Sequence, residues 1–451
     1  MVNKNRISGK DLKKSLNLVI IAASLGLPFF AITGGPALTG FTRELGAGDF
    51  FYTVIMALPV IGAVIQVLAS YTIEAVGTRK PFMIIAGLIH RLLWIPVAAV
   101  PFIILPEHSS ARIWVATIII AVSGMANSVT AISFNSWMGI LVPTEIKGRF
   151  FSKRTMIYTI TSGVSALVCG KLLDAYPGFS GFAAVFVLAA ILGAADIVLF
   201  FWVKEPRRER SEKIPAFHQL FTEPFRDKNY FKYILFVSFW YFGVNFAGPF
   251  FNVYMIEQLR MSFLVITLFT QVIASFSTVL SIRFWGSLVD KYGSKPVMWV
   301  CCVVIIALPF VWLFATPGST WIVLVINLLS GIFWSGFELT ALNQSIWLAP
   351  EKNRSIYLAN YALVVNVIGT ALAFLCGGMF MELTGNAVKA MHLPFLHGQL
   401  LSNYHLLFIL SGLIRLLVVW LIFRKYEEKD SKQAADMVSG LLSGVKSRIR
   451  R

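Results

Sequence analysis

Long uninterrupted runs of apolar residues are the feature that most constrains this chain. Residues 50–70 and 297–315 are two such runs, of 21 and 19 residues. A helix rises ~1.5 Å per residue, so a run of this length spans the ~30 Å hydrocarbon core of a bilayer. Only 14% of the residues are charged, whereas soluble domains carry roughly 25%. The sequence therefore predicts an integral membrane protein.

Twelve such spans are predicted along the chain. The runs are continuously apolar, whereas the strands of a transmembrane barrel alternate apolar and polar residues over ~10 positions, so a barrel is excluded. The predicted fold class is an all-α membrane protein. The spans cover residues 17–38, 49–72, 82–105, 113–141, 155–174, 181–203, 230–255, 262–284, 297–316, 320–348, 356–382 and 403–423.

The basic residues are divided unequally between the two ends of the predicted spans. Of 39 Lys and Arg residues, 32 fall on the side that carries both termini and 5 fall on the other side. Cytoplasmic loops retain Lys and Arg, so both termini are predicted to be cytoplasmic, in a plasma or inner membrane. The net charge of +17 thus indicates topology and contact with anionic lipid headgroups, and no nucleic-acid partner is expected.

The chain contains an internal repeat. KPFM at residues 80–83 matches KPVM at residues 295–298, an offset of 215 positions. CGKLLD at residues 169–174 resembles CGGMFME at residues 376–382, an offset of 207 positions. Three further weak matches occur at similar offsets, so chance is a poor explanation. The repeat unit is six spans.

The two copies meet at a polar, basic connection. We predict an N-terminal six-helix bundle at residues 1–203, a cytoplasmic linker at 204–229, a C-terminal bundle at 230–424 and a basic cytoplasmic tail at 425–451. The linker is long enough for the two bundles to move relative to one another. Two bundles repeated in parallel are typical of transporters that expose a central site to one side and then to the other.

Two glycine-punctuated turns carry a resemblance to a known family. GSLVDKYGSK at residues 286–295 has a Gly, then an Asp, a basic residue and Gly293. SYTIEAVGTRK at residues 70–80 is a degenerate copy with Glu74 in the acidic position. In these motifs and over its whole length the chain resembles the major facilitator superfamily of secondary transporters. The resemblance implies two pseudo-symmetric six-helix bundles around a central cavity.

Carboxylates in these turns can pair with arginines and hold the cytoplasmic side closed. We expect Asp290 to pair with Arg354 and, in the first half, Glu74 to pair with Arg149. These latches would hold when the central site faces outward and break when it faces inward. The alternative is an ordinary solvated turn, with tight geometry supplied by Gly293 and charges that set topology.

Arg91 and Asp196 are charged residues inside predicted spans, where each charge costs ~2.5–3.5 kcal/mol or more. Both lie ~10–15 Å from the cytoplasmic end of their spans. The resemblance places the third and sixth helices side by side, so a structural Arg91–Asp196 pair is the leading interpretation. A proton relay that includes His90 is the alternative. His90 alone is typical of a buried neutral imidazole with a backbone partner.

Glu338 is the candidate coupling residue. It lies on the tenth predicted span, which the resemblance places at the central cavity together with the fourth. A lone carboxylate there is a candidate proton or cation site. The alternative is that Glu338 is a structural partner of Arg415, which lies at similar depth on the twelfth span.

Amide and aromatic side chains around the expected cavity suit a neutral or weakly polar organic solute. Membrane aromatics are more often packing residues or interface anchors, so each candidate has a structural alternative. The candidates are Trp240, Tyr241, Asn245, Asn252, Gln271, Asn127, Asn360 and Asn366.

These features favour a secondary transporter that moves a small organic solute, with protons as the expected coupling ion. A lipid or lysolipid flippase on the same fold stays open, because the Phe-rich chain would suit acyl groups. A receptor that binds a ligand without moving it is a further alternative. No enzyme activity, cofactor, metal or nucleotide is expected, since no phosphate-binding glycine loop is present. A monomer is expected.

Overall fold

The computed structural model describes residues 8–26, 28–206, 219–351, 354–391, 394 and 400–428. In this part of the chain the secondary structure is helical, apart from one isolated bridge between Pro394 and Leu400. Eleven of the described helical segments are long and apolar enough to cross a membrane. Helix α4 (Asp49–Val76), which has 28 residues, supplies a twelfth apolar segment. The all-helical membrane fold class is therefore confirmed.

The first six spans are built from nine helices. Residue 27, between α1 and α2, lies outside the described residues; the first span is interrupted at Gly34, and the third at Leu93. The helices are α1 (Gly9–Gly26), α2 (Pro28–Thr33), α3 (Gly35–Glu44), α4, α5 (Lys80–Leu92), α6 (Trp94–Ile103), α7 (Ser109–Leu141), α8 (Lys147–Ala175) and α9 (Phe179–Leu199).

The second six spans contain three π-helical stretches, which are rare and are found mostly at functional sites. They are η4 (Tyr254–Gln258), η5 (Leu268–Ile273) and η8 (Val365–Leu372). A short helix, α10 (Gln219–Arg226), precedes these spans. The other helices are α11 (Lys228–Val253), α12 (Phe263–Thr267), α13 (Ala274–Tyr292), α14 (Ser294–Val311), α15 (Trp321–Leu348), α16 (Arg354–Val364), α17 (Ala373–Met391) and α18 (Asn403–Leu421).

Contacts divide the chain into two units. Unit 1 is Met1–Ile214 with Phe251–Thr267, and unit 2 is Pro215–Phe250 with Leu268–Arg451. Each unit has its own apolar core. The predicted linker lies largely outside the described residues, from 207 to 218, and so does the predicted tail from residue 429 onward.

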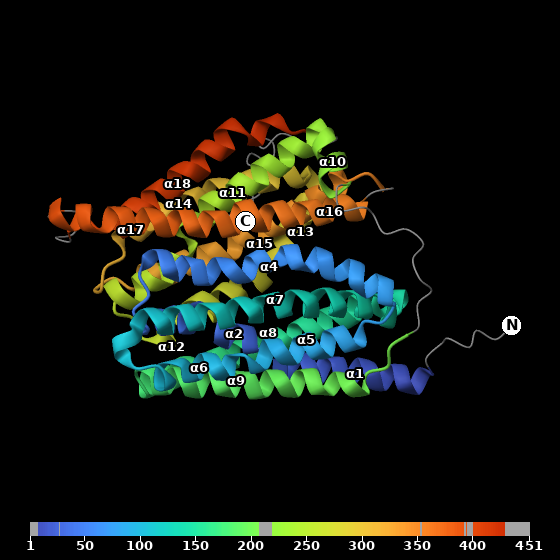
Figure 1. The fold of residues 1–451 in the computed structure, drawn as a ribbon. Helices are drawn as coiled ribbons and strands as arrows, with labels where there is room; N and C mark the ends of the chain where they lie inside the picture. Colours follow the sequence, from blue (N-terminus) through green and yellow to red (C-terminus); the bar gives the residue numbers. More distant parts are fainter. Residues whose placement is uncertain are drawn as a thin grey trace, which may run out of the picture. The chain divides into compact units, whose positions relative to one another are not determined.

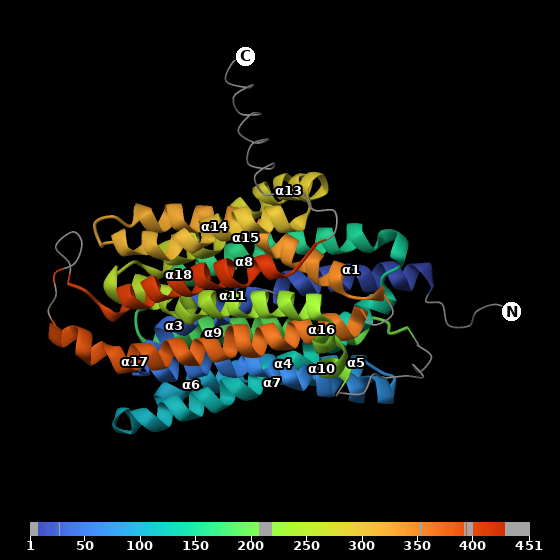
Figure 2. The same cartoon turned by 90° about the horizontal axis from the view of Figure 1, so that it is seen from above.

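The helix packing inside each unit repeats. In unit 1, α7 packs against both α4 and α5 (Figure 1). In unit 2, α15 packs in the same way against α13 and α14 (Figure 2). The outer pair of helices also repeats, because α5 packs on α9 and α14 packs on α18. The internal sequence repeat is therefore a repeat of packing as well.

A segment of the second sequence repeat belongs by its contacts to unit 1. This segment, Phe251–Thr267, joins α11 to α13, whose remaining residues lie in unit 2. Two π-helical turns, η4 and η5, lie at its two ends. The chain thus passes between the units at places where regular α-helical hydrogen bonding changes register.

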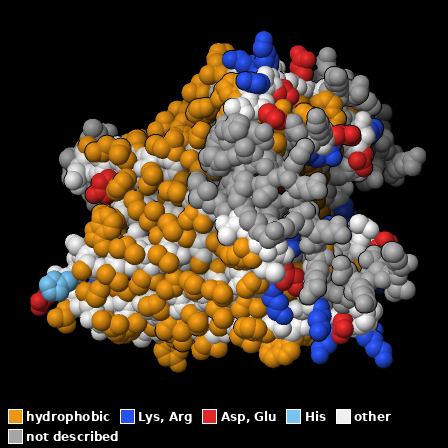
Figure 3. All heavy atoms as spheres, turned by 45° about the vertical axis from the view of Figure 1, so that its right-hand side comes forward, with side chains coloured by type: hydrophobic (Ala, Val, Ile, Leu, Met, Phe, Trp, Pro, Cys, Tyr) orange, Lys and Arg blue, Asp and Glu red, His pale blue; other side chains and the backbone are white. Residues whose placement is uncertain are grey.

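The surface is largely apolar. Figure 3 shows a face covered by hydrophobic side chains, with charged side chains gathered toward one edge. On α8, Met156, Ile160 and Val164 repeat every four residues and are 58–60% exposed. Exposed apolar surface on this scale is unfavourable in water and is expected for contact with lipid or with a membrane cavity.

Candidate functional site

The carboxylate of Glu338 lies in unit 2, where it accepts a hydrogen bond from Tyr241. The Tyr241 hydroxyl donates to Glu338 Oε1 at 2.6 Å, joining α11 to α15. Glu338 is exposed, and no cation of the described residues lies within ion-pair distance of it. An accessible carboxylate with a single neutral donor is able to gain or lose a proton without breaking an ion pair.

Aromatic rings surround this carboxylate–phenol pair. The Tyr241 ring stacks on Trp334, with ring centroids 6.2 Å apart. Trp240 stacks on Phe337 at 5.2 Å, and Phe337 also meets the Tyr241 ring edge-on at 5.8 Å. Trp240 and Phe337 are fully buried. The packed rings fix the position of the phenol, so its hydroxyl is held toward Glu338.

The predicted amides have different surroundings in the structure. Asn245 donates to the backbone oxygen of Gly369 at 2.9 Å and to Thr370 Oγ1 at 3.1 Å. It therefore connects α11 to the π-helical stretch η8. Asn366 is half-buried within η8, whereas Asn360 on α16 is fully buried.

Of the other three predicted amides, one lies in unit 2 with Glu338 and two lie in unit 1. Gln271 lies half-buried in the π-helical turn η5 of unit 2. Asn127, on α7, and Asn252, in the last turn of α11, are half-buried residues of unit 1. Of the predicted polar residues, Tyr241 is therefore the one that the described contacts join to Glu338.

Two buried charged residues of unit 1, Arg91 and Asp196, form an ion pair. Arg91 on α5 lies with its Nη2 3.4 Å from Asp196 Oδ2 on α9, at the equal depth that the sequence indicated. The Arg91 guanidinium also lies over the rings of Phe29 and Phe30, 4.1 and 4.6 Å from their centroids. Cation–π contacts of this kind contribute most where water is excluded.

His90 has a partner other than Asp196. Ser123 Oγ donates to the backbone oxygen of His90 at 3.0 Å and lies 2.8 Å from His90 Nδ1. Because the hydroxyl has one proton, which goes to the carbonyl, Nδ1–H is the donor to Ser123 Oγ. The imidazole is thus held by α7, and none of the described hydrogen bonds joins it to the Arg91–Asp196 pair. The proton relay stays an alternative interpretation.

Arg415 is not the partner of Glu338, and that alternative is corrected. Arg415 Nη1 donates to the backbone oxygen of Ile305 at 3.0 Å, and its Nη2 donates to Ser411 Oγ at 3.0 Å. Glu338 instead accepts from Tyr241. The two charges lie at similar depth along their helices, but each is satisfied by other groups.

The predicted latch residues lie in exposed positions. Asp290 and Arg354 are both exposed, and no ion pair joins them among the described contacts. Gly293 ends α13 with φ +93°, a conformation that favours glycine. Arg149 is exposed, whereas the side chain of its expected partner Glu74 lies outside the described residues. The latch therefore stays a prediction.

Two carboxylates that were not predicted from the sequence cap the starts of α5 and α14. Glu205 accepts the backbone N–H groups of Arg79 and Lys80, at 2.6 and 3.3 Å, where α5 begins. Glu428 accepts those of Ser294 and Lys295, at 3.0 and 2.7 Å, where α14 begins. Each satisfies N–H groups that have no partner inside the helix.

The lysine of each repeated Lys–Pro motif completes this cap. Lys80 Nζ donates to the backbone oxygens of Phe201 and Val203, and Lys295 Nζ donates to that of Tyr426. A signal was available in the sequence. A Glu follows the sixth span at position 205, and another follows the twelfth span at position 428. The offset between these two positions is similar to the offsets of the other repeat matches.

At the opposite end of unit 1, a third carboxylate caps α12. Asp174 accepts the backbone N–H groups of Phe263 at 2.7 Å and Leu264 at 2.9 Å. Arg43 pairs with both Asp49 and Glu257. These contacts attach the segment Phe251–Thr267 to helices of the first repeat.

Comparison with known proteins identifies the fold. The sequence profile of the Major Facilitator Superfamily matches residues 18–283 and 234–450. The chain has no significant match among curated protein sequences. Among the described residues, no group of three or more His, Cys, Asp or Glu side chains is placed to hold a metal ion.

Solved transporters have similar structures. A variant of the nucleoside transporter NupG superposes with a TM-score of 0.73 at 14% identity, over 92% of this chain and 100% of that one. A bacterial homologue of the iron transporter ferroportin gives 0.68 at 14% identity, over 92% and 98%. The xylose transporter XylE from E. coli gives 0.66 at 15% identity, over 94% and 99%. At these identities the likeness concerns the fold.

Proposed function

The chain belongs to the major facilitator superfamily, and we propose that it moves a small organic solute across a membrane by alternating access, coupled to protons at Glu338. The profile match and the transporter neighbours support a secondary transporter and not an enzyme. The observation that carries the proposal is the exposed Glu338 carboxylate, bonded to Tyr241 among stacked aromatic rings. We further propose a monomer in a plasma membrane, with cytoplasmic termini.

Glu338 and Tyr241 have distinct roles in this mechanism. The carboxylate takes up a proton on one side of the membrane and releases it on the other. The phenol stabilises the charged form by donating to it and loses that bond when the carboxyl group turns to a substrate. The partly exposed rings of Tyr241 and Trp334 offer apolar faces to an organic solute, as in most small-molecule sites.

The segment Phe251–Thr267 supplies a second element of the proposed mechanism. Alternating access requires the bundles to move, and this segment is attached to unit 1 while its chain neighbours belong to unit 2. The topology predicted from the basic residues puts it on the outer side. We propose that Asp174 and the Arg43–Glu257 pair form an outer clamp, which opens when the site faces outward.

The coupling proposal is tested by transport into proteoliposomes. A thermal-shift panel of solutes first identifies the substrate, since a ligand at 100 times its Kd stabilises the folded state by ~2.7 kcal/mol. Glu338→Gln is then expected to retain substrate exchange between equal pools and to lose accumulation driven by a pH gradient. Accumulation that survives in Glu338→Gln would exclude this residue as the coupling site.

Two variants serve as controls for this experiment. Glu107→Gln removes a carboxylate from the short helical turn Pro106–His108 and is expected to behave as the parent protein does. Tyr241→Phe keeps the ring and removes the hydroxyl, so it is expected to change the pH dependence of transport and leave the fold intact. A panel in which lipids alone give a thermal shift would instead favour the flippase alternative.

The outer clamp is tested by Asp174→Asn. Asparagine keeps the shape and loses the charge that stabilises the start of α12, an effect of about 1 kcal/mol. We expect faster labelling of a cysteine placed at Arg260, in the loop between η4 and α12. Asp49→Asn, which leaves the Arg43–Glu257 contact in place, is the matched control. Equal labelling of Asp174→Asn and the parent would remove the clamp from the mechanism.

A further inference from the structure

One face of α1 is left uncovered by the rest of unit 1. The opposite face is buried against α8 and α9 through Ser15, Val19 and Ala22. The uncovered residues recur three or four positions apart, so they share one side of the helix. They are Lys10, Lys13, Lys14, Asn17 and Ile21, with the half-buried Leu18 at the edge of this face.

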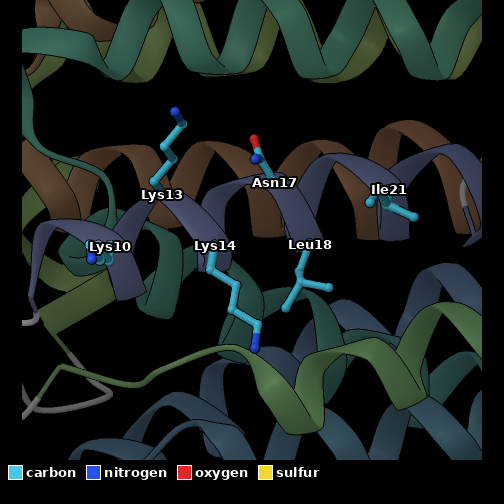
Figure 4. Close-up of a pocket in the computed structure, with 6 residues that line it drawn as sticks. All are labelled: Lys10, Lys13, Lys14, Asn17, Leu18 and Ile21. Carbon is cyan, nitrogen blue, oxygen red and sulfur yellow. The ribbon is translucent and has the colours of Figure 1, made fainter.

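These six residues line an open pocket of about 380 Å³. Figure 4 shows them in sequence order along α1, with Lys13 and Asn17 pointing to one side and Lys14 and Leu18 to the other. The polarity changes steadily along the helix, from three ammonium groups through one amide to two aliphatic side chains. Ile21 is 50% exposed, so the apolar end is uncovered as well.

The positive charge of this face is not neutralised by the described part of the chain. None of the three lysines forms an ion pair there. Asp11 is the acidic residue of the same helix, and it is half-buried next to the uncovered face. The pocket therefore has a net positive end that is open to a ligand.

We infer that this face of α1 binds an anionic phospholipid. The phosphate of the headgroup is held by the ammonium groups of Lys10, Lys13 and Lys14, with Asn17 able to donate a further hydrogen bond. The first part of an acyl chain lies along Leu18 and Ile21, which are ~10 Å farther along the helix axis than the lysines.

The change along the helix from charged to aliphatic side chains favours a lipid over a soluble anion. A free phosphate would use the lysines and leave the aliphatic end uncovered in water. An uncharged lipid would cover that end and leave three ammonium groups without counter-charge. An anionic amphiphile satisfies both ends, and basic residues near a membrane surface attract anionic lipids. This inference does not depend on the proposed transport function.

The test is a lipid titration of the purified full-length protein in a neutral detergent. Dioleoylphosphatidylglycerol is the probe, dioleoylphosphatidylcholine is the uncharged comparison, and the unfolding temperature is followed by tryptophan fluorescence. The triple variant Lys10→Gln, Lys13→Gln and Lys14→Gln is expected to weaken the response to phosphatidylglycerol tenfold or more. The single variant Lys13→Gln is expected to give a smaller loss in the same direction.

A matched triple variant removes the same charge elsewhere. Arg226→Gln, Lys228→Gln and Lys232→Gln alter exposed residues of α10 and α11, and this variant is expected to keep the full response. Equal losses in the two triple variants would overturn the inference, because the effect would then be general surface electrostatics. An equal response to phosphatidylcholine would also overturn it.

Two further measurements separate the headgroup from the acyl chain. Inorganic phosphate alone is expected to produce no stabilisation. A full response to phosphate would identify a free-anion site and overturn the lipid assignment. Ile21→Asn is expected to reduce the preference for dioleoyl- over dihexanoylphosphatidylglycerol, whereas an unchanged preference would show that no acyl chain lies on this face.

Discussion

The last helices of the two six-span repeats carry opposite charges at equivalent positions. In unit 1, α9 carries Asp196, which packs against Gly26 so closely that a methyl group there would overlap its carboxylate. In unit 2, α18 carries Arg415, which packs against Gly243 less tightly, because a methyl group there would lie 3.1 Å from Arg415 Cγ. The offsets are 217 positions for the glycines and 219 for the charges. In both repeats a glycine leaves room for the charged side chain of a neighbouring helix.

The difference between the two positions lies in how the charge is satisfied. Asp196 has a cationic partner in Arg91, whereas Arg415 donates to a backbone carbonyl and to a serine hydroxyl. A helix interior offers carbonyl oxygens with a spare lone pair, but its N–H groups are already used. A buried arginine can therefore be satisfied by helices alone. A buried aspartate needs a side-chain donor.

The largest effect is expected for Arg91→Met. It leaves Asp196 buried without its cation, and breaking a buried pair from one side costs about 3–5 kcal/mol of unfolding free energy. The double variant Arg91→Met with Asp196→Leu removes both charges and is expected to recover most of that loss. Denaturant unfolding in detergent measures both. A double variant as unstable as the single one would contradict the comparison.

A smaller effect is expected where the glycines are changed. Gly26→Ala places a methyl group against the Asp196 carboxylate, and overpacking of this kind costs about 1–3 kcal/mol. Gly243→Ala meets Ile414 and Arg415 side-chain atoms at 3.0 and 3.1 Å, so it is expected to cost less. Gly139→Ala on α7, with no atom within 4 Å, is the control. The same loss in all three would show only a backbone effect.

The smallest effect is expected for Arg415→Met, at about 1 kcal/mol or less. Ser411 Oγ keeps a partner, because it also donates to the backbone oxygen of Gly243 at 2.6 Å. The backbone oxygen of Ile305 loses its donor, and the helix supplies none because residue 309 is a proline. That cost is offset because a charged guanidinium is no longer buried away from water. A loss as large as that of Arg91→Met would mean that the two units do not differ in this respect.

The helices and their repeat could be predicted from the sequence, because span length and repeated motifs are properties of the chain itself. The depth of Arg91 and Asp196 along their spans also indicated a pair, and the structure has them 3.4 Å apart. These quantities follow from counting residues along a helix.

The partners of Glu338 and Arg415 could not be predicted in this way. Equal depth suggested that they could pair, but which side chains meet depends on how each helix is rotated about its axis. That rotation is fixed by packing over the whole unit, as in the stacking of Tyr241 on Trp334. Arg415 adds a second difficulty, since its acceptor is the backbone of Ile305, which any residue there would supply.

The caps at Glu205 and Glu428 bear on how the protein is made. Glu205 bonds to Arg79 across 126 positions, and Glu428 bonds to Ser294 across 134. In each half the residue that completes the cap is therefore synthesised after all six spans of that half. The first half can close on its own last residues while the ribosome is still making the second, so each bundle can be locked as a unit before the two meet.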